Sequence, residues 1–364
     1  MSERPAPRVA PLPPSRWTAV QRQTVARFAA DDRIDPLLAT LLHVPEMVEA
    51  VAPMTRYVTE ASTLSPSQRL LLARRTAWLN HNDALWTMHA TGGANREQEA
   101  IELLAHGRIE DHEGTDRSLL QLTDELVLNA SVNDSTWASL AAGHDLKWMM
   151  DAVETVAHVT FLCCLAGAFG VRPPDQVIDA DAGGPEHPAA VPREPPLTAA
   201  RIEPVEGAEI AVLRTFARHP VMTAARRPRA AFVNRLSPLT AHDRETLILR
   251  IGWVCGSEYE WAKHVGSVGH ARDHGVDPAL VAAGPAAPGV SAGDAHLMQI
   301  ADEVHRDAAV SDRSWRGLLE RYGLPGAMSA VFTVSSYRAT SMSLNAYGVQ
   351  LEPGDEGFHL SHRE

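Results

Sequence analysis

Two stretches of the sequence carry the same pattern: SPSQRLLLARRTAWLNHNDALWTMH at residues 65–89 and TAHDRETLILRIGWVCGSEYEWAKH at residues 240–264. The second stretch follows the first at a constant offset of 175. With this offset, residues 36–89 align with residues 211–264 without a gap, and 15 of the 54 positions are identical. Chance identity for ordinary compositions is about one position in fifteen, so the match indicates an internal repeat.

A second block of the chain repeats as well. With an offset of 178, residues 123–171 align with residues 301–349, and 16 of these 49 positions are identical. The two blocks together predict a tandem duplication, with a first unit at residues 35–171 and a second unit at residues 209–349.

The local signals within each unit are helical. Ser65, Pro66 and Gln68 have the spacing of an N-cap, a first-turn proline and a capping-box partner, and Thr240 begins a looser version of the same signal. Apolar residues recur at helical spacing in later segments of the first unit, and no segment alternates over several residues as a half-buried strand does. We predict an all-α protein made of two homologous helical units. The later segments are residues 119–128, 137–141 and 146–169.

Three segments outside the units look less structured. Residues 1–34 begin with a proline-rich stretch and are expected to be a flexible N-terminal segment. Residues 172–208 contain eight prolines with scattered Gly and Ala, which predicts a semi-extended linker or a strap over the surface. Residues 350–364 are expected to be a loose C-terminal tail.

Composition narrows the classes of function. Lys plus Arg against Asp plus Glu gives 33 − 45 = −12. An acidic chain without a basic block repels phosphate, so we expect no nucleic-acid partner. No apolar run approaches the length of about 20 residues that crosses a bilayer, and the first residues do not resemble a secretion signal, so we expect a cytoplasmic protein with no membrane partner. Three cysteines, two of them adjacent, cannot form a disulfide framework, which fits a reducing compartment.

The densest polar cluster beside an apolar helix lies in the second unit. Glu260 and His264 are four residues apart, so on one helix their side chains share a face. Glu245 lies near the start of the preceding helix, and a helical hairpin can fold it back against that pair. The cluster also contains Arg250, Cys255, Ser257, Tyr259 and Trp261.

The spacing of Glu245, Ser257, Glu260 and His264 resembles a motif of the carboxymuconolactone decarboxylase and AhpD-like alkylhydroperoxidase superfamily. Peroxidase members carry Glu, eleven residues, Cys-x-x-Cys, three residues and His. Ser257 and Glu260 replace both cysteines here, and Tyr259 stands just before the second. Glu260-x-x-x-His264 is similar to the motif of the decarboxylase branch, which lacks the redox pair.

The resemblance implies an AhpD-like helical fold and a cofactor-independent acid/base enzyme, a decarboxylase, lyase or isomerase acting on a small carboxylated or lactone-like substrate. In such an enzyme His264 delivers a proton to a carbanion or enolate, Glu245 or Glu260 sets its tautomer, and Tyr259 completes the catalytic group. Members of the family assemble into rings, so we expect a homo-oligomer. Neither a cofactor nor a metal is expected.

Four neighbouring residues are candidate substrate contacts. Arg250 could hold a substrate carboxylate, and Ser257, Trp261 and Cys255 lie beside the predicted catalytic group. The first unit keeps counterparts of Arg250, Trp261 and His264, so a structural role is the alternative for these residues. Their counterparts are Arg75, Trp86 and His89.

The first unit lacks the acids of the second. Leu70, Leu85 and Ala84 replace Glu245, Glu260 and Tyr259, which predicts one active site per chain, at the second unit.

Simpler interpretations of the motif remain open. Ser257 and Glu260 have the spacing of a capping box, Glu245 suits the positive end of a helix, and His264 could be a satisfied buried histidine.

Three other functions or sites are alternatives. The chain could be a non-catalytic ligand-binding or assembly protein, or a single-thiol peroxidase that uses Cys255. A metal held by Glu245, Glu260 and His264 with His270 or His274 is disfavoured, because the last two lie in what looks like the solvated end of a helix.

Overall fold

The computed structural model describes residues 6–28, 34–90, 105–173, 194–207 and 209–358, and among these residues it contains helices and connecting segments but no strand. The all-α prediction is confirmed. In the first unit and the segment before it, the helices are α1 (Ala19–Ala26), α2 (Pro36–Leu41), α3 (Pro45–Arg56), α4 (Pro66–Leu79), α5 (Asp83–Ala90), α7 (Gly114–Asn129), α8 (Asp134–Ala141) and α9 (Leu146–Phe169).

The second unit follows a similar order. Its helices are α10 (Ala211–Phe216), α11 (Pro220–Ala231), α12 (Ala241–Val254), α13 (Glu258–Val265), α14 (Pro278–Ala283), α15 (Ala292–Asp307) and α16 (Asp312–Tyr347). A π-helical turn follows α3 at Tyr57–Ala61, and another follows α11 at Phe232–Leu236.

The helix starts follow the predicted signals. Ser65 accepts a hydrogen bond from the Gln68 amide, the Gln68 side chain accepts one from the Ser65 amide, and Pro66 is the first residue of α4. Thr240 caps α12 by accepting a hydrogen bond from the Asp243 amide. These bonds satisfy backbone donors that a helix start leaves without an intrahelical partner.

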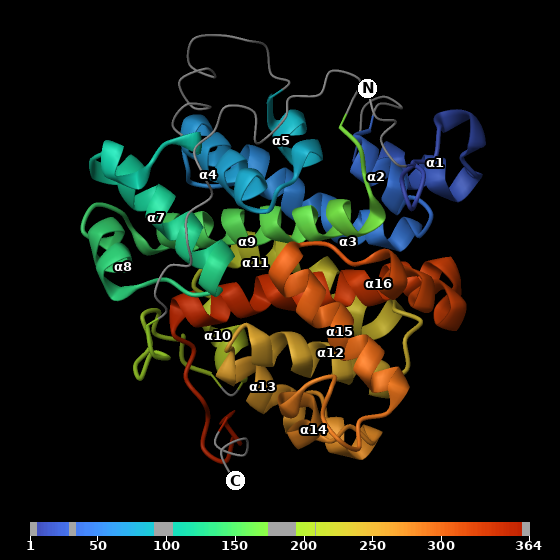
Figure 1. Ribbon diagram of the computed structural model, residues 1–364. Coiled ribbons are helices and arrows are strands. Elements are labelled where there is room, and N and C mark those ends of the chain that lie inside the picture. Colours follow the sequence, from blue (N-terminus) through green and yellow to red (C-terminus); the bar gives the residue numbers. More distant parts are fainter. Residues whose placement is uncertain (1–5, 29–33, 91–104, 174–193, 208, 359–364) are drawn as a thin grey trace.

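One hydrophobic core runs through both units. In Figure 1 the long helices α9 and α16 cross the middle of the molecule, most first-unit helices lie above them, and α12 to α14 lie below. Helix α9 packs on α16, where the Phe161 and Phe332 rings meet edge to face at 5.1 Å, and α3 packs on α11. Most buried apolar side chains of both units form one continuous cluster, and a smaller separate cluster lies in the second unit.

Buried contacts of the two units recur at the offsets found in the sequence. Arg75 of α4 pairs with Asp124 of α7 through two bonds of 2.7 Å, and Arg250 of α12 pairs with Asp302 of α15 at 2.6 and 3.0 Å. Each arginine also donates to two backbone carbonyls. These two ion pairs fix the same pair of helices in each unit.

Helix α16 spans the region that α8 and α9 occupy in the first unit. Gly323 interrupts it with a φ of 65° and a ψ of −177°, so it is two helical segments joined at a kink. A residue with a side chain adopts this φ rarely, which suits a glycine at the junction.

The segments outside the two units pack more than the sequence predicts. In the described part of the N-terminal segment, Val9 and Trp17 are buried and the Val9 amide donates to the carbonyl of Phe169 at 3.0 Å. Residues 194–207 lie as a strap that buries Ile202. In the C-terminal segment, Phe358 packs against the indole ring of Trp261. The expectation of loose termini therefore does not hold for residues 6–28 and 350–358.

Helix α9 has the length and composition of a membrane span, which corrects the expectation that no apolar run approaches that length. Almost all of its apolar stretch is buried among other helices of the protein, so its hydropathy is that of a central core helix.

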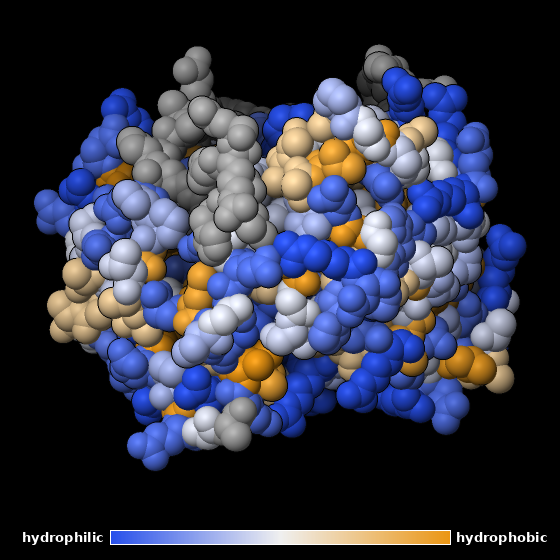
Figure 2. Space-filling view, turned by 90° about the horizontal axis from the view of Figure 1, so that it is seen from below, coloured by the Kyte–Doolittle hydropathy of each residue, from blue (hydrophilic) through white to orange (hydrophobic). Residues whose placement is uncertain are grey.

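The face viewed from below, in Figure 2, is largely hydrophilic, with hydrophobic side chains in small separate groups.

Candidate functional site

Helices α12 and α13 form the hairpin that positions the predicted catalytic group. Helix α12 ends at Val254, Gly256 turns the chain with a φ of 57°, and α13 begins at Glu258. The hairpin folds Glu245 in the second turn of α12 back onto His264 in the last turn of α13. Glu260 lies one helical turn before His264 on the same face.

His264 lies between two carboxylates. Its Nδ1 atom is 2.6 Å from Oε2 of Glu245, and its Nε2 atom is 3.0 Å from Oε1 of Glu260. Arg244 donates from Nε to the other Glu245 oxygen at 3.1 Å. The side chains of Glu245, Glu260 and His264 are all less than a tenth exposed, so these charges interact in an environment with little water.

This arrangement makes His264 an unusually weak acid. Burial acts to lower its pKa, but the hydrogen bonds and negative charges of Glu245 and Glu260 outweigh burial and raise the pKa to about 9. At neutral pH the ring is therefore an imidazolium that donates from both nitrogens, one proton to each carboxylate.

The capping-box interpretation of Ser257 and Glu260 is wrong. Ser257 is the N-cap residue of α13 by position, but its side chain makes no capping hydrogen bond. Its buried Oγ atom has no hydrogen-bond partner among the described residues. The Glu260 carboxylate points instead toward His264, so Glu260 belongs to the candidate site and not to the helix cap.

The imidazolium and Glu260 face a cavity of about 490 Å³, in the size range of small-molecule sites. Helices α10, α11, α13 and α16 form its walls. Apolar side chains from α10 line much of it, and the Tyr337 ring from α16 stands edge-on to His264 at 5.0 Å. Glu245 does not line the cavity, so it supports His264 from behind while Glu260 and His264 face the contents.

Tyr259 also lines this cavity, but its hydroxyl has a structural bond. The Val212 amide at the start of α10 donates to it at 3.1 Å. Burial and nearby carboxylates raise the pKa of Tyr259, so the phenol stays protonated at neutral pH. Tyr259 therefore ties α10 to α13 and presents its ring, rather than a phenolate, to the cavity.

Arg250 does not reach the cavity. The pair with Asp302 and the carbonyls of Val281 and Ala282 occupy its guanidinium. This corrects the expectation that Arg250 holds a substrate carboxylate. The structural alternative suggested by its first-unit counterpart, Arg75, describes what Arg250 does.

The other predicted substrate contacts also lie outside the cavity lining. Trp261 is buried in a small cluster with Trp253 and Phe358. The Sγ atom of Cys255 is buried 3.5 Å from Nδ1 of His305 on α15. Ser257 is buried as well, and none of these three residues lines the cavity.

The structure gives little support to the metal alternative. Among the described residues, no group of three or more His, Cys, Asp or Glu side chains has the arrangement of a metal site. The carboxylates of Glu245 and Glu260 engage opposite nitrogens of His264, and the His270 side chain is more than half exposed.

The sequence did not predict a role for three arginines of the cavity wall. Arg226, Arg227 and Arg229 all lie on α11 and line the cavity beside His264. Comparison of the two copies could have found them, because the matched first-unit residues are apolar: Val51, Ala52 and Met54. An apolar position of one copy that becomes charged in the other marks a local change of role.

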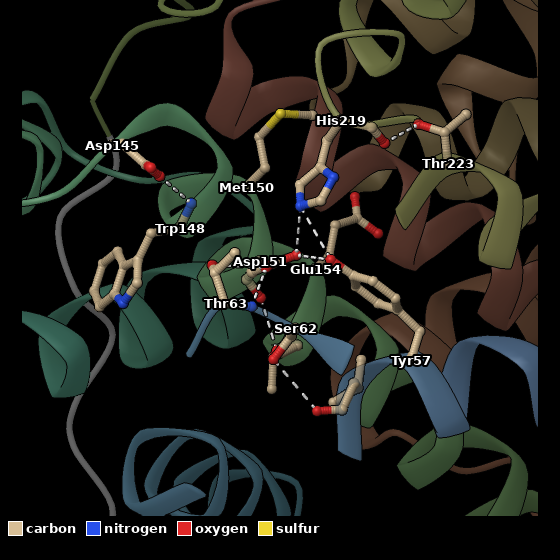
Figure 3. A network of polar contacts seen from close by, with 12 residues as sticks. Tyr57, Ser62, Thr63, Asp145, Trp148, Met150, Asp151, Glu154, His219 and Thr223 are labelled. Carbon is tan, nitrogen blue, oxygen red and sulfur yellow. Dashed lines mark hydrogen bonds and ion pairs between the residues drawn. The ribbon is translucent and has the colours of Figure 1, made fainter. Parts of the chain in front are cut away.

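A second buried polar network lies near α11, at the contact between the units (Figure 3). Asp151 of α9 accepts hydrogen bonds from the Tyr57 hydroxyl at 2.7 Å and from the amide and hydroxyl of Thr63 at 2.7 and 2.8 Å. His219, just before α11, lies 3.2 Å from the same carboxylate. One turn further along α9, Glu154 accepts from the Ser343 hydroxyl at 2.6 Å. This network anchors the start of α11 to the first unit.

A larger and more open groove of about 910 Å³ lies over α15 and α16. Its buried acid, Glu303, accepts hydrogen bonds from Ser311 and Ser314, and His296 bonds the Ser314 carbonyl. Because these groups stabilise the start of α16, the cavity beside His264 is the better candidate site.

Comparison with known proteins finds no match: no family model, no curated protein and no solved structure matches the chain.

Proposed function

We propose that the protein is a cofactor-independent acid/base enzyme of the carboxymuconolactone decarboxylase type. It acts as a decarboxylase, lyase or isomerase on a small carboxylated or lactone-like molecule in the cytoplasm. The observation that carries this proposal is the Glu245–His264–Glu260 group, with the last two residues on the wall of a cavity of small-molecule size. By the same resemblance we propose a homo-oligomer, which a native mass measurement would test.

The raised pKa of His264 keeps a proton on the ring at neutral pH, so that the ring can deliver it. In a decarboxylation, the bond between the substrate carbon and the leaving carboxylate breaks, and its electron pair stays on the carbon as a carbanion or enolate. The His264 imidazolium gives a proton to that carbon, carbon dioxide leaves, and water restores the proton to the ring. In an isomerisation, Glu260 accepts a proton from one carbon and His264 returns a proton to another.

Glu245 acts in this scheme as a positioning residue. Its bond to Nδ1 fixes the orientation of the ring and stabilises the charged form, while Arg244 holds the carboxylate in place. Glu260 and His264 are the catalytic residues, because they face the cavity.

A non-catalytic ligand-binding protein remains the second candidate. The observation that favours it is that both nitrogens of the imidazolium are paired with carboxylates. A buried charged cluster needs such pairing for stability even if it has no catalytic role. Under this alternative the cavity binds a molecule but no proton moves.

Solvent exchange separates the two candidates. A panel of carboxylated lactones and unsaturated carboxylic acids, incubated with the protein in deuterium oxide, can be followed by proton NMR for replacement of carbon-bound hydrogen. We expect wild type to exchange at least one of them, and His264→Ala to lose exchange by at least about a hundredfold, the usual size of a general acid–base contribution.

The matched control is His242→Ala, because His242 is also paired with a carboxylate in the second unit but lies outside this cavity. This variant should exchange as wild type does. Exchange that persists unchanged in His264→Ala and Glu245→Gln would falsify the proposed role.

A further inference from the structure

Arg229 is a buried cation without an ion-pair partner among the described residues. Its residue is 3% exposed, and no hydrogen bond or ion pair joins its guanidinium to any of these residues. The guanidinium carbon lies over the Phe161 ring, 5.1 Å from the ring centroid. Burying an unpaired charge is costly, so such a residue calls for a partner that the protein itself does not supply.

Positive charge exceeds negative charge around Arg229. Arg226 lies one turn earlier on α11, and its Nε atom is 3.4 Å from Oε2 of Glu154. Glu154 also accepts hydrogen bonds from Ser343 and Tyr347, and it makes no ion pair with Arg229. Two guanidinium groups thus share one carboxylate at this wall of the cavity.

Arg229 remains charged in spite of its burial. Burial and the charge of Arg226 lower its pKa, and the charge of Glu154 offsets part of this effect. The resulting pKa of about 9 still leaves the guanidinium protonated at neutral pH. The nearby Lys263 does not add to the excess, because Asp355 and Glu352 pair with its ammonium.

The part of the cavity wall that α10 forms is apolar. Val212, Leu213 and Phe216 line it, and Leu213 is half exposed. A ligand that fits this wall has an apolar body and one anionic end.

We propose that Arg229, assisted by Arg226, binds the anionic group of the substrate, and that the substrate is a small amphipathic anion whose body lies along α10. The proposal rests on the proposed function for the reaction at Glu260 and His264 but adds the recognition element. A guanidinium fork matches the two oxygens of a carboxylate and those of a phosphate alike, so the shared chemistry is an oxyanion.

Benzoate, phenyl phosphate and the neutral isostere benzamide are suitable probes, titrated into the full chain and followed by ligand-observed NMR. We expect saturable binding of at least one anion and much weaker binding of benzamide. Arg229→Met, which installs the residue of the first unit, should weaken anion binding by about tenfold or more, the loss expected for a hydrogen bond to a charged group. Tighter binding of benzoate or of phenyl phosphate identifies the group that the site prefers.

Two variants control for folding and for general charge. Arg229→Lys keeps the cation and should retain part of the affinity, and Arg235→Met removes an exposed arginine that does not line the cavity and should bind as wild type does. The melting temperature of each variant reports whether it folds.

Equal anion binding by wild type and Arg229→Met would overturn the proposal, as would no saturable binding of either anion by wild type. The readout is binding and not turnover. Loss of proton exchange with Arg229-dependent binding intact would therefore remove the proposed reaction and leave the anion site standing.

Discussion

At the scale of single residues, the site is defined by where the two units differ. Glu245, Glu260 and Arg229 stand where the first unit has Leu70, Leu85 and Met54. Each of the three is buried in the second unit, where a charge needs a partner or a purpose. Glu245 and Glu260 pair with His264, whereas Arg229 forms no ion pair among the described residues, which is why we assign the anionic group of a ligand to it.

The charge of His264 links the site to stability. A folded-state pKa of about 9 exceeds the unfolded value of 6.5, so the resulting stabilisation is fully present below pH 6.5 and is lost as pH rises through about 9. Glu245→Gln removes one of the two charges that raise this pKa. We expect the stability advantage of wild type over Glu245→Gln to shrink between pH 6.5 and pH 9.5.

The full shift from 6.5 to about 9 corresponds to a free energy on the order of 3 kcal/mol, which is the upper limit for this change. Urea unfolding at several pH values measures the difference, and groups common to both proteins cancel. A difference that stays constant or grows with pH would contradict the assignment of the charge to His264.

At the scale of elements, the α12–α13 hairpin and the turn after it hold the proposed catalytic group. Gly269 follows α13, and a Cβ atom at this position would lie 2.3 Å from Oε2 of Glu245 and 2.7 Å from Nδ1 of His264. The backbone thus passes directly against the bond between these two side chains, and only a glycine leaves room for it.

Gly269→Ala should therefore disturb the site without removing any of its groups. We expect a stability loss of about 1–3 kcal/mol, the usual cost of overpacking, together with slower proton exchange. Gly143→Ala is the matched control, because an added Cβ there meets no atom within 4 Å. Thermal unfolding and the exchange assay check both variants, and wild-type behaviour of Gly269→Ala would show that the pair tolerates displacement.

The sequence predicted elements better than it predicted the use of their side chains. The capping signals at Ser65 and Thr240 placed the starts of α4 and α12, because caps are local. The same logic failed at Ser257, where the tertiary contact between Glu260 and His264 prevails over the local cap. Arg250 illustrates a similar limit, since its partner Asp302 is 52 residues away in the chain.

At the scale of the whole molecule, the segments of the first and second units share a hydrophobic core, and a first-unit side chain reaches the candidate site. Helices α9 and α16 pack together at the centre, and Glu154 of α9 reaches Arg226 on the cavity wall of the second unit. The first unit thus helps to place a charged group of the candidate site. Sequence comparison predicted a degenerate first copy, but not this contact, because side-chain contacts between the copies leave no mark in the repeat itself.

The termini show why packing at this scale is hard to predict. Proline-rich composition favours extended backbone, but it does not say whether the segment lies on the protein. Trp17 and Phe358 are the apolar anchors in these segments, and each is packed against the folded units. The sequence signal for this packing was an isolated aromatic residue in an otherwise polar segment.

The most direct test of the central claim is an NMR titration of His264 in the intact protein, with its ring signals assigned by their absence in His264→Gln. The account predicts an imidazolium protonated on both nitrogens at pH 7.5, with an apparent pKa of about 9 that falls in Glu245→Gln. A His264 ring that is neutral at pH 7.5 and titrates at or below its ordinary value of 6.5 would contradict the account.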